Sequence, residues 1–217
     1  MKFKHLLITA TVLGALGVAA PSFAADAKAE AKVVVIRAGK LVDVVAGTVL
    51  KDQTIVITGE RITSVGPSAS AKLPAGAQVI DLSSQTVLPG LIDMHTHLTA
   101  DAYLGGYNAL GVSDTRAALY GVRAARKTLE AGFTSVRNVG ASGFGDVALR
   151  DAIDEGDFIG PRMRTAGYAI GIQGGHCDEN LLPADKNVVG RGVADGPWQA
   201  RAKVREMAKY GADVIKI

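Results

Sequence analysis

The pattern of apolar and polar positions changes near residue 86. Before it, short apolar runs such as residues 33–36 and 54–57 alternate with turn residues. Thr58-Gly59-Glu60 separates two of these runs and is typical of a β-hairpin. The pattern therefore predicts a small, sandwich-like β domain over residues 32–86.

From residue 87 onward the pattern predicts strands that alternate with helices. Ser113 and Asp195 precede two of the helices as candidate caps, and Pro197 is suited to a first helical position. This alternation is typical of βαβ units and a parallel sheet. The expected strands cover residues 87–98, 133–139, 163–170 and 214–217, and the expected helices cover residues 114–130, 146–155 and 197–210.

The expected fold class is α/β, the first four β/α units of a (β/α)8 barrel over residues 87–217. Glycines cluster after the first three strands, where a barrel places its active-site loops. A complete barrel needs eight strands and about 250 residues. We therefore expect the N-terminal half of a longer, here truncated, protein. The alternative is a small open sheet, whose fourth strand would lack a covering helix.

The first 24 residues are typical of a secretory signal peptide. Lys2 and Lys4 precede an apolar stretch, and Ser22-Phe23-Ala24 is a small-x-small cleavage pattern. The stretch is shorter than the roughly 20 residues of a membrane span. We expect an exported protein, periplasmic or secreted, with no membrane association after signal removal and a disordered start over residues 25–31.

Charge and cysteine content exclude some classes of function. The chain of 217 residues carries a formal charge of +3, and loss of Lys2 and Lys4 would leave 22 basic and 21 acidic residues. This balance gives no reason to expect a nucleic-acid partner. Cys177 is the only cysteine, so no disulfide forms within the chain. A homo-oligomer remains open.

His95 and His97 are the most informative residues. They end the first expected barrel strand, and residues i and i+2 of a strand point to the same face. Imidazole is the commonest neutral metal ligand near pH 7. The pair therefore predicts half of a divalent-metal site, although two histidines at a sheet edge would give the same spacing.

Several motifs together resemble the amidohydrolase superfamily of metal-dependent barrel hydrolases. Within it, the chain is most similar to the Xaa-Pro-dipeptidase-like and carboxypeptidase-like branch, with imidazolonepropionases and ochratoxin-type amidases as relatives. The motifs are Leu88-Pro89-Gly90-Leu91-Ile92-Asp93-Met94-His95-Thr96-His97, Gly132-Phe133-Thr134-Ser135-Val136-Arg137-Asn138-Val139-Gly140, Gly174-Gly175-His176-Cys177-Asp178 and Gly211-Ala212-Asp213-Val214-Ile215-Lys216-Ile217.

The resemblance implies roles for individual residues. His95 and His97 would bind the more buried of two divalent metals, expected to be zinc, and Lys216 would carry a carbamate that bridges them. Burial of Lys216 would favour the neutral amine, the form that reacts with carbon dioxide. A surface position for Lys216 stays open. His176 would line the substrate pocket or stabilise its loop, and relatives often have Asp at the position of Asn138.

The predicted function is hydrolysis of a small-molecule amide, a dipeptide or an N-acyl amino acid, by metal-activated water. The resemblance places the general base, an aspartate, after residue 217, so no catalytic base is expected within the chain and the chain alone would be inactive. Two alternatives remain: a non-catalytic fragment, and a cyclic-amide hydrolase of the imidazolonepropionase type.

Overall fold

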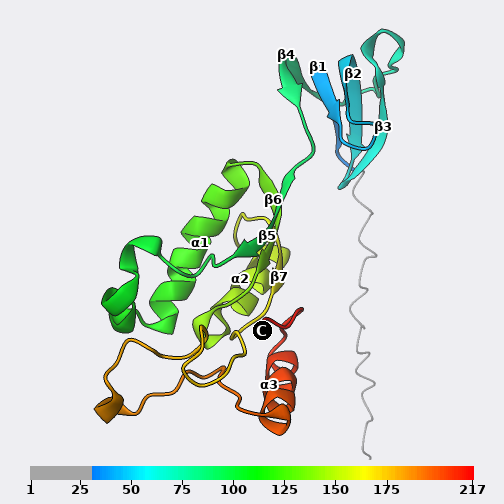
Figure 1. Ribbon diagram of the computed structural model, residues 1–217. Coiled ribbons are helices and arrows are strands. Elements are labelled where there is room, and N and C mark those ends of the chain that lie inside the picture. Colours follow the sequence, from blue (N-terminus) through cyan, green and yellow to red (C-terminus); the bar gives the residue numbers. More distant parts are fainter. Residues whose placement is uncertain (1–30) are drawn as a thin grey trace, which may run out of the picture. The chain divides into compact units, whose positions relative to one another are not determined.

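The computed structural model describes residues 31–217, which divide into two compact units at the junction of Val87 and Leu88 (Figure 1). The signal-peptide prediction and all but the last residue of the expected disordered start lie outside the described residues. Within residues 31–217, no helix is both long and apolar enough to cross a membrane.

The first unit is one four-stranded sheet in the order β3-β2-β1-β4. Asp43 Oδ1 accepts hydrogen bonds from the N–H groups of Val45 and Ala46 in the turn of the first hairpin. The predicted sandwich-like arrangement is therefore wrong, because the described residues of this unit form one sheet and not two packed sheets. Its strands are β1 (Val33–Asp43), β2 (Thr48–Thr58), β3 (Arg61–Pro67) and β4 (Gln78–Val87).

The second unit contains a three-stranded parallel sheet in the order β5-β6-β7. Helices occupy the connections, as the alternating pattern predicts for βαβ units. The elements are β5 (Leu91–Thr96), α1 (Asp114–Glu130), β6 (Phe133–Asn138), α2 (Gly145–Asp154), β7 (Arg162–Thr165) and α3 (Pro197–Lys209).

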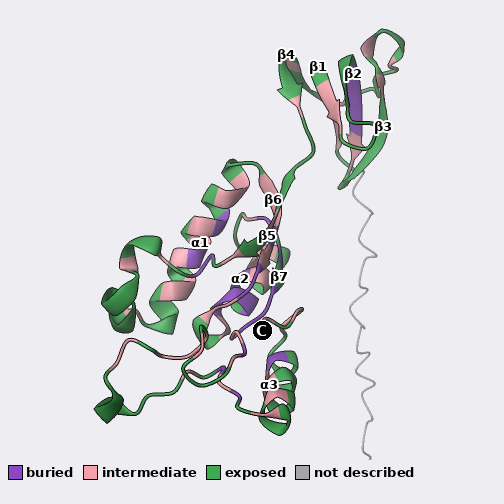
Figure 2. Ribbon diagram, in the orientation of Figure 1, coloured by how far each residue is buried: buried purple, intermediate pink, exposed green. Residues whose placement is uncertain are grey.

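Apolar packing between α1, α2 and the sheet forms the core of the second unit. Ala125 of α1 and Leu149 of α2 belong to the same buried cluster as Val136 of β6 and Met163 of β7. Figure 2 shows buried residues on the inner face of α2. Met207 anchors α3 in a second cluster with Ile170. The core therefore fixes the ends of the strands from which the candidate site is built.

The predicted boundaries of α1 are confirmed. The Ser113 hydroxyl accepts a hydrogen bond from Arg116 N, and Gly132 follows the helix with φ +97°. The predicted Asp195 cap of α3 is wrong. Its carboxylate accepts from Gln173 N at 2.8 Å instead, and Gly196 occupies the cap position without a side-chain bond.

The first and third predicted barrel strands are shorter than expected. Val87 ends β4, and β5 begins only after Pro89-Gly90, because proline has no N–H to donate to a ladder. β7 ends at Thr165 rather than at residue 170, since Ala166 N and Gly167 N donate to the Asp146 carboxylate and not to a neighbouring strand.

The predicted fourth strand over residues 214–217 is not formed. β7 ends at Thr165, and Gly167, two residues later, adopts φ +67°, so the backbone beyond β7 does not continue a regular ladder for this segment. It is nevertheless attached at both ends. Asp213 N and Val214 N donate to Thr165 O, and Ile170 N donates to Lys216 O at 2.8 Å. Lys216 therefore lies beside the chain that follows β7.

The Asp213 carboxylate holds this segment in place. It accepts hydrogen bonds from Arg150 at 2.7 Å, Thr165 N at 2.9 Å and Arg164 at 3.2 Å. Burial by itself would raise the pKa of Asp213, but the bonds from Thr165 and Arg150 outweigh it, so the pKa is lowered. The Asp213 and Arg150 side chains are only 19% and 14% exposed.

Asp213→Asn should lower the free energy of unfolding at pH 7 by about 2 kcal/mol, because it breaks a largely buried charge pair. The folded carboxyl has a lowered pKa, so its stabilisation is complete above the unfolded pKa of about 3.9 and is lost as the pH falls through the folded pKa. Thermal melts from pH 7 to 2 should show the difference from wild type shrinking below about pH 4. Asp185→Asn, at an exposed pair with Lys186, is the control. If the difference in stability between wild type and Asp213→Asn did not change with pH, the ionised Asp213 carboxylate would not be the stabilising group.

Candidate metal and substrate site

His95 and His97 lie at the carboxyl end of β5 with their ring centroids 5.5 Å apart. Asp93 Oδ1 accepts a hydrogen bond from His95 N at 3.0 Å, and the ladder with β6 is irregular between Asp93 and Thr96. Both histidines are exposed. The strand end therefore presents two imidazoles close together, the arrangement that the His-x-His spacing predicts.

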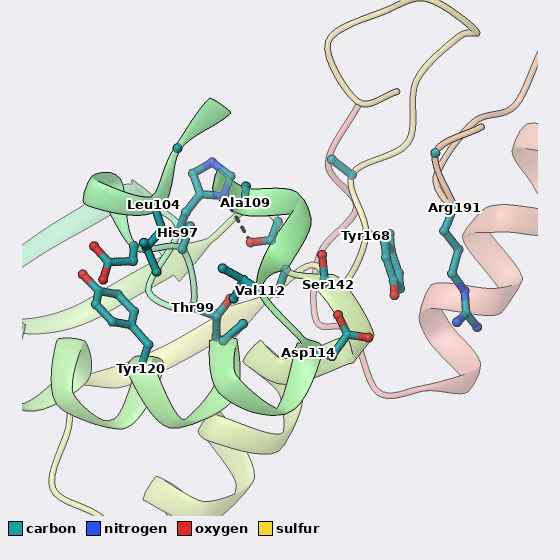
Figure 3. Close-up of a pocket in the computed structure, with 18 of the residues that line it drawn as sticks. His97, Thr99, Leu104, Ala109, Val112, Asp114, Tyr120, Ser142, Tyr168 and Arg191 are labelled. Atoms are coloured by element: carbon teal, nitrogen blue, oxygen red, sulfur yellow. Dashed lines mark hydrogen bonds between the residues drawn. The ribbon is translucent and has the colours of Figure 1, made fainter. Parts of the chain in front are cut away.

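A hydrogen bond fixes the His97 ring. Its Nδ1 lies 3.1 Å from the carbonyl oxygen of Gly140, drawn as a dashed line in Figure 3. A carbonyl oxygen only accepts, so the contact assigns the hydrogen to Nδ1 and leaves the lone pair of the neutral ring on Nε2. His97 is thereby prepared to act as a metal ligand through Nε2.

The backbone beyond the strand ends connects His97 to Lys216. Gly140 contacts His97, Ala141 N donates to Gly167 O, and Ile170 N donates to Lys216 O. Lys216 is half-buried, whereas its neighbours Ile215 and Ile217 are exposed. The lysine thus belongs to the same carboxyl edge of the sheet as the histidines.

The residues present fit part of a metal coordination shell. Two imidazoles are suitable ligands for zinc and similar divalent ions. Nowhere in residues 31–217 do three His, Cys, Asp or Glu side chains converge in a metal-binding arrangement. The ligand role of Lys216, and the complete shell, therefore remain predictions.

A cavity of about 760 Å³ lies beside His97. Figure 3 shows side chains from α1 and from the loops after β5, β6 and β7 around it. His176 lines the same cavity as His97, whereas His95 and Lys216 do not. Its polar lining includes Asp101, Asp114, Arg116, Tyr120, Arg123, Ser142, Tyr168, Asp178, Glu179 and Arg191.

The loop that carries His176 is organised by Asp178. Its carboxylate accepts hydrogen bonds from Gly174 N, Gly190 N and Glu179 N at 2.6–2.7 Å, and these bonds lower the pKa of Asp178. Among the described residues, the exposed His176 ring makes no hydrogen bond of its own. Asp178 therefore stabilises the loop that brings His176 to the cavity.

A strained turn follows β6 on another side of the cavity. Phe144 adopts φ +54°, a conformation that costs a bulky residue on the order of 1–3 kcal/mol. The Tyr168 hydroxyl accepts a hydrogen bond from Gly143 N at 2.6 Å, and the Phe144 and Tyr168 rings meet edge to face at 5.3 Å. These contacts hold the strained turn next to Ser142.

Sequence reasoning missed the buried polar residues that support the site. The sequence places Asn138 at the end of a barrel strand near the site, where an asparagine can hydrogen-bond loop backbone, and Asp146 at a helix start, but it does not predict that the two residues form a buried pair. Both are completely buried and hydrogen-bonded to each other at 3.2 Å. A polar residue ending an apolar strand was the available signal for Asn138.

Gly140→Ala should weaken binding of zinc about tenfold, a typical effect of disturbing a residue that orients a ligand. A Cβ at Gly140 would lie 3.0 Å from His97 Cε1 and 3.2 Å from Nδ1, so the ring would have to shift. Gly145→Ala is the control, since its added methyl would meet Ala118 at an ordinary 3.6 Å. Chelator competition measures both, and equal affinities would show that the ring has room to adjust.

A model of the amidohydrolase family matches residues 86–217 of the chain. The chain belongs to the amidohydrolase family. This amidohydrolase is 32% identical to the ochratoxinase of Aspergillus niger over 210 residues, which cover 87% of the chain and 42% of the relative. It is 42% identical to the imidazolonepropionase of Arthrobacter sp. (strain FB24) over 83 residues, 34% of the chain and 20% of that relative.

Solved structures agree with this assignment. A Xaa-Pro dipeptidase with bound methionine matches with a TM-score of 0.75 and 35% identity, over 85% of this chain and 46% of that chain. The amidohydrolase chain thus spans less than half the length of this ochratoxinase and of this dipeptidase. The expected family and the expected α/β fold, the first units of a (β/α)8 barrel, are confirmed.

Proposed function

We propose that the whole protein is a metal-dependent amidohydrolase that cleaves the amide bond of a dipeptide or an N-acyl amino acid. The observation that carries this proposal is the pair of imidazoles at the end of β5, with His97 held in the tautomer that exposes Nε2 beside a cavity. Relatives named as a Xaa-Pro dipeptidase and an ochratoxinase support this substrate class.

Different residues of the chain would bind the metal ions and the substrate. His95, His97 and a carbamate on Lys216 would hold two divalent ions, expected to be zinc. A bound divalent ion activates water at neutral pH and polarises the scissile carbonyl. His176 would orient the substrate from the loop after β7. The acidic and basic side chains of the cavity suit a dipeptide, which carries both an amine and a carboxylate, and its basic side chains suit the carboxylate of an N-acyl amino acid.

The test is turnover of a substrate panel by the protein in its full encoded length. Free dipeptides, N-acyl amino acids and cyclic amides are each assayed after metal removal and after addition of zinc. Zinc-dependent cleavage of the first two supports the proposal, whereas cleavage of cyclic amides alone favours the imidazolonepropionase-type alternative. A protein that binds zinc without hydrolysing any of them, or binds none, would refute it.

His176→Ala should raise KM about tenfold and lower kcat less, because the ring would contact the substrate and not the metal. His176→Gln is the informative companion, since its amide keeps a donor on the same loop and should recover part of the loss. Steady-state kinetics on the best dipeptide measures both. If both variants instead lost kcat equally and kept the KM of the wild type, His176 would be assigned to the chemical step.

Export is a separate proposal, which rests on the basic start, apolar stretch and cleavage pattern of residues 1–24. Amino-terminal sequencing of the protein made in a bacterial host should find Ala25 as the first residue. A protein that retains Met1–Ala24 in the cell would contradict it.

A further inference from the structure

A buried side-chain amide lies next to His97. Asn138, the last residue of β6, has no exposed surface. Its Nδ2 donates to Gly140 O at 3.1 Å and to Asp146 Oδ2 at 3.2 Å. Its Oδ1 accepts from Leu98 N at 2.7 Å and Thr96 Oγ1 at 3.4 Å. Both hydrogens of the amide are therefore used, and its oxygen accepts from Leu98 N and shares the Thr96 hydroxyl with Arg137 O at 3.4 Å.

Three of these bonds involve residues next to His97. Thr96 and Leu98 are the residues on either side of it in the chain, and Gly140 O is the atom that accepts from His97 Nδ1. Asn138 thus fixes both the backbone that carries the imidazole and the carbonyl that sets its tautomer. Removal of the amide would free all three positions at once.

Asp146 fixes the orientation of the amide. The buried carboxyl lies in the first turn of α2, where the helix dipole favours negative charge. Its Oδ2 also accepts from Ala166 N at 3.2 Å and Gly167 N at 3.1 Å. Because a carboxylate only accepts, the Asn138 face toward Asp146 must be Nδ2, and Oδ1 must face Leu98.

We propose that Asn138, oriented by Asp146, is a positioning residue that sets the tautomer and direction of His97 and thereby the affinity of this site for a divalent metal ion. The inference rests on the proposed function, in which His97 is a metal ligand. An aspartate of the same size retains an acceptor for Leu98 N but has no hydrogen for Gly140 O. It would also place a second carboxyl against Asp146, whereas the amide of Asn138 donates to both Gly140 O and Asp146.

The alternative is that the network merely ties β6 to α2 and β7. Val136 provides a matched control, since it lies on the same face of the same strand, is 3% exposed and belongs to the apolar core. Val136→Ala removes buried contacts without touching the bonds around His97. A purely structural role predicts that Asn138 variants behave like Val136→Ala once stability is matched.

The experiment compares the wild type, Asn138→Asp, Asn138→Leu and Val136→Ala in the full encoded protein. Nitrogen-15 NMR of the histidine rings, recorded without metal, reports the His97 tautomer. Chelator competition reports the dissociation constant for zinc. We expect both Asn138 variants to lose the uniform Nδ1–H tautomer and to bind zinc at least about tenfold more weakly, with Val136→Ala close to wild type.

Unchanged tautomer and zinc affinity in Asn138→Asp and Asn138→Leu would overturn the inference while leaving the proposed function intact. If the wild type bound no zinc, the proposed function would fail. The metal-free ring spectra would still decide whether Asn138 positions His97. If Asn138→Leu fails to fold, Asn138→Asp, which preserves size and the Leu98 bond, carries the test.

Discussion

His97→Ala should lower kcat/KM for the best dipeptide about 1000-fold and abolish stoichiometric zinc binding. A bound metal supplies several kcal/mol of transition-state stabilisation, and each 1.36 kcal/mol corresponds to a factor of ten in rate. Because the His97 side chain is exposed, its removal should leave the melting temperature nearly unchanged. Zinc titration and steady-state kinetics on the full encoded protein measure the effect.

His97→Asn tests the Nε2 lone pair of His97 separately from the hydrogen bond between Nδ1 and Gly140 O. The asparagine amide offers a donor for Gly140 O in place of Nδ1, but it has no equivalent of the imidazole Nε2. It should therefore be as inactive as His97→Ala. Retention of zinc-dependent activity by His97→Asn would mean that the ring contributes through its hydrogen bond and not as a ligand.

Lys216→Met should lower kcat/KM at least about a hundredfold and reduce the zinc content from two ions to one or none, because no bridging carbamate could form. Methionine is unbranched and of similar length, so it should preserve the packing of the half-buried stem. Metal analysis and carbon-13 NMR after addition of labelled bicarbonate measure the two consequences.

Lys216→Ala is the matched variant for this prediction. It leaves space where the stem was, so a short carboxylate such as acetate should restore part of its zinc content and activity. Lys216→Met should not respond to acetate, because its side chain fills that space. Two bound zinc ions in Lys216→Met, or no carbamate signal in the wild type, would remove Lys216 from the metal site.

Local signals in the sequence predicted the three α-helices among residues 31–217, three of the four expected barrel strands and the position of the two histidines. Ser113 and Gly132 mark the ends of α1 through their own capping and turn chemistry, and the structure places both as expected. His95 and His97 depend only on a two-residue spacing at a strand end, which brings their rings within 5.5 Å. Each signal involves neighbours in the chain.

Features that depend on distant residues were not predicted. The predicted Asp195 cap is wrong because the Asp195 carboxylate accepts its hydrogen bond from Gln173 N, 22 positions away in the sequence. The end of β7 was misplaced because its next two N–H groups donate to Asp146. In both places a polar group forms its hydrogen bond with a residue distant in the sequence, and the local sequence pattern does not predict that partner.

The sequence by itself determined the alternation of strands and helices, the family, and the two histidines at the end of the first barrel strand, because periodicity and short spacings act within a few residues. Only the tertiary structure decided which ring nitrogen of His97 carries the hydrogen that bonds to Gly140 O, and how Asn138 and Asp146 are oriented. The physical reason is that buried donors and acceptors must all be paired, and their partners are identified only once β5, β6, β7 and α2 are packed together.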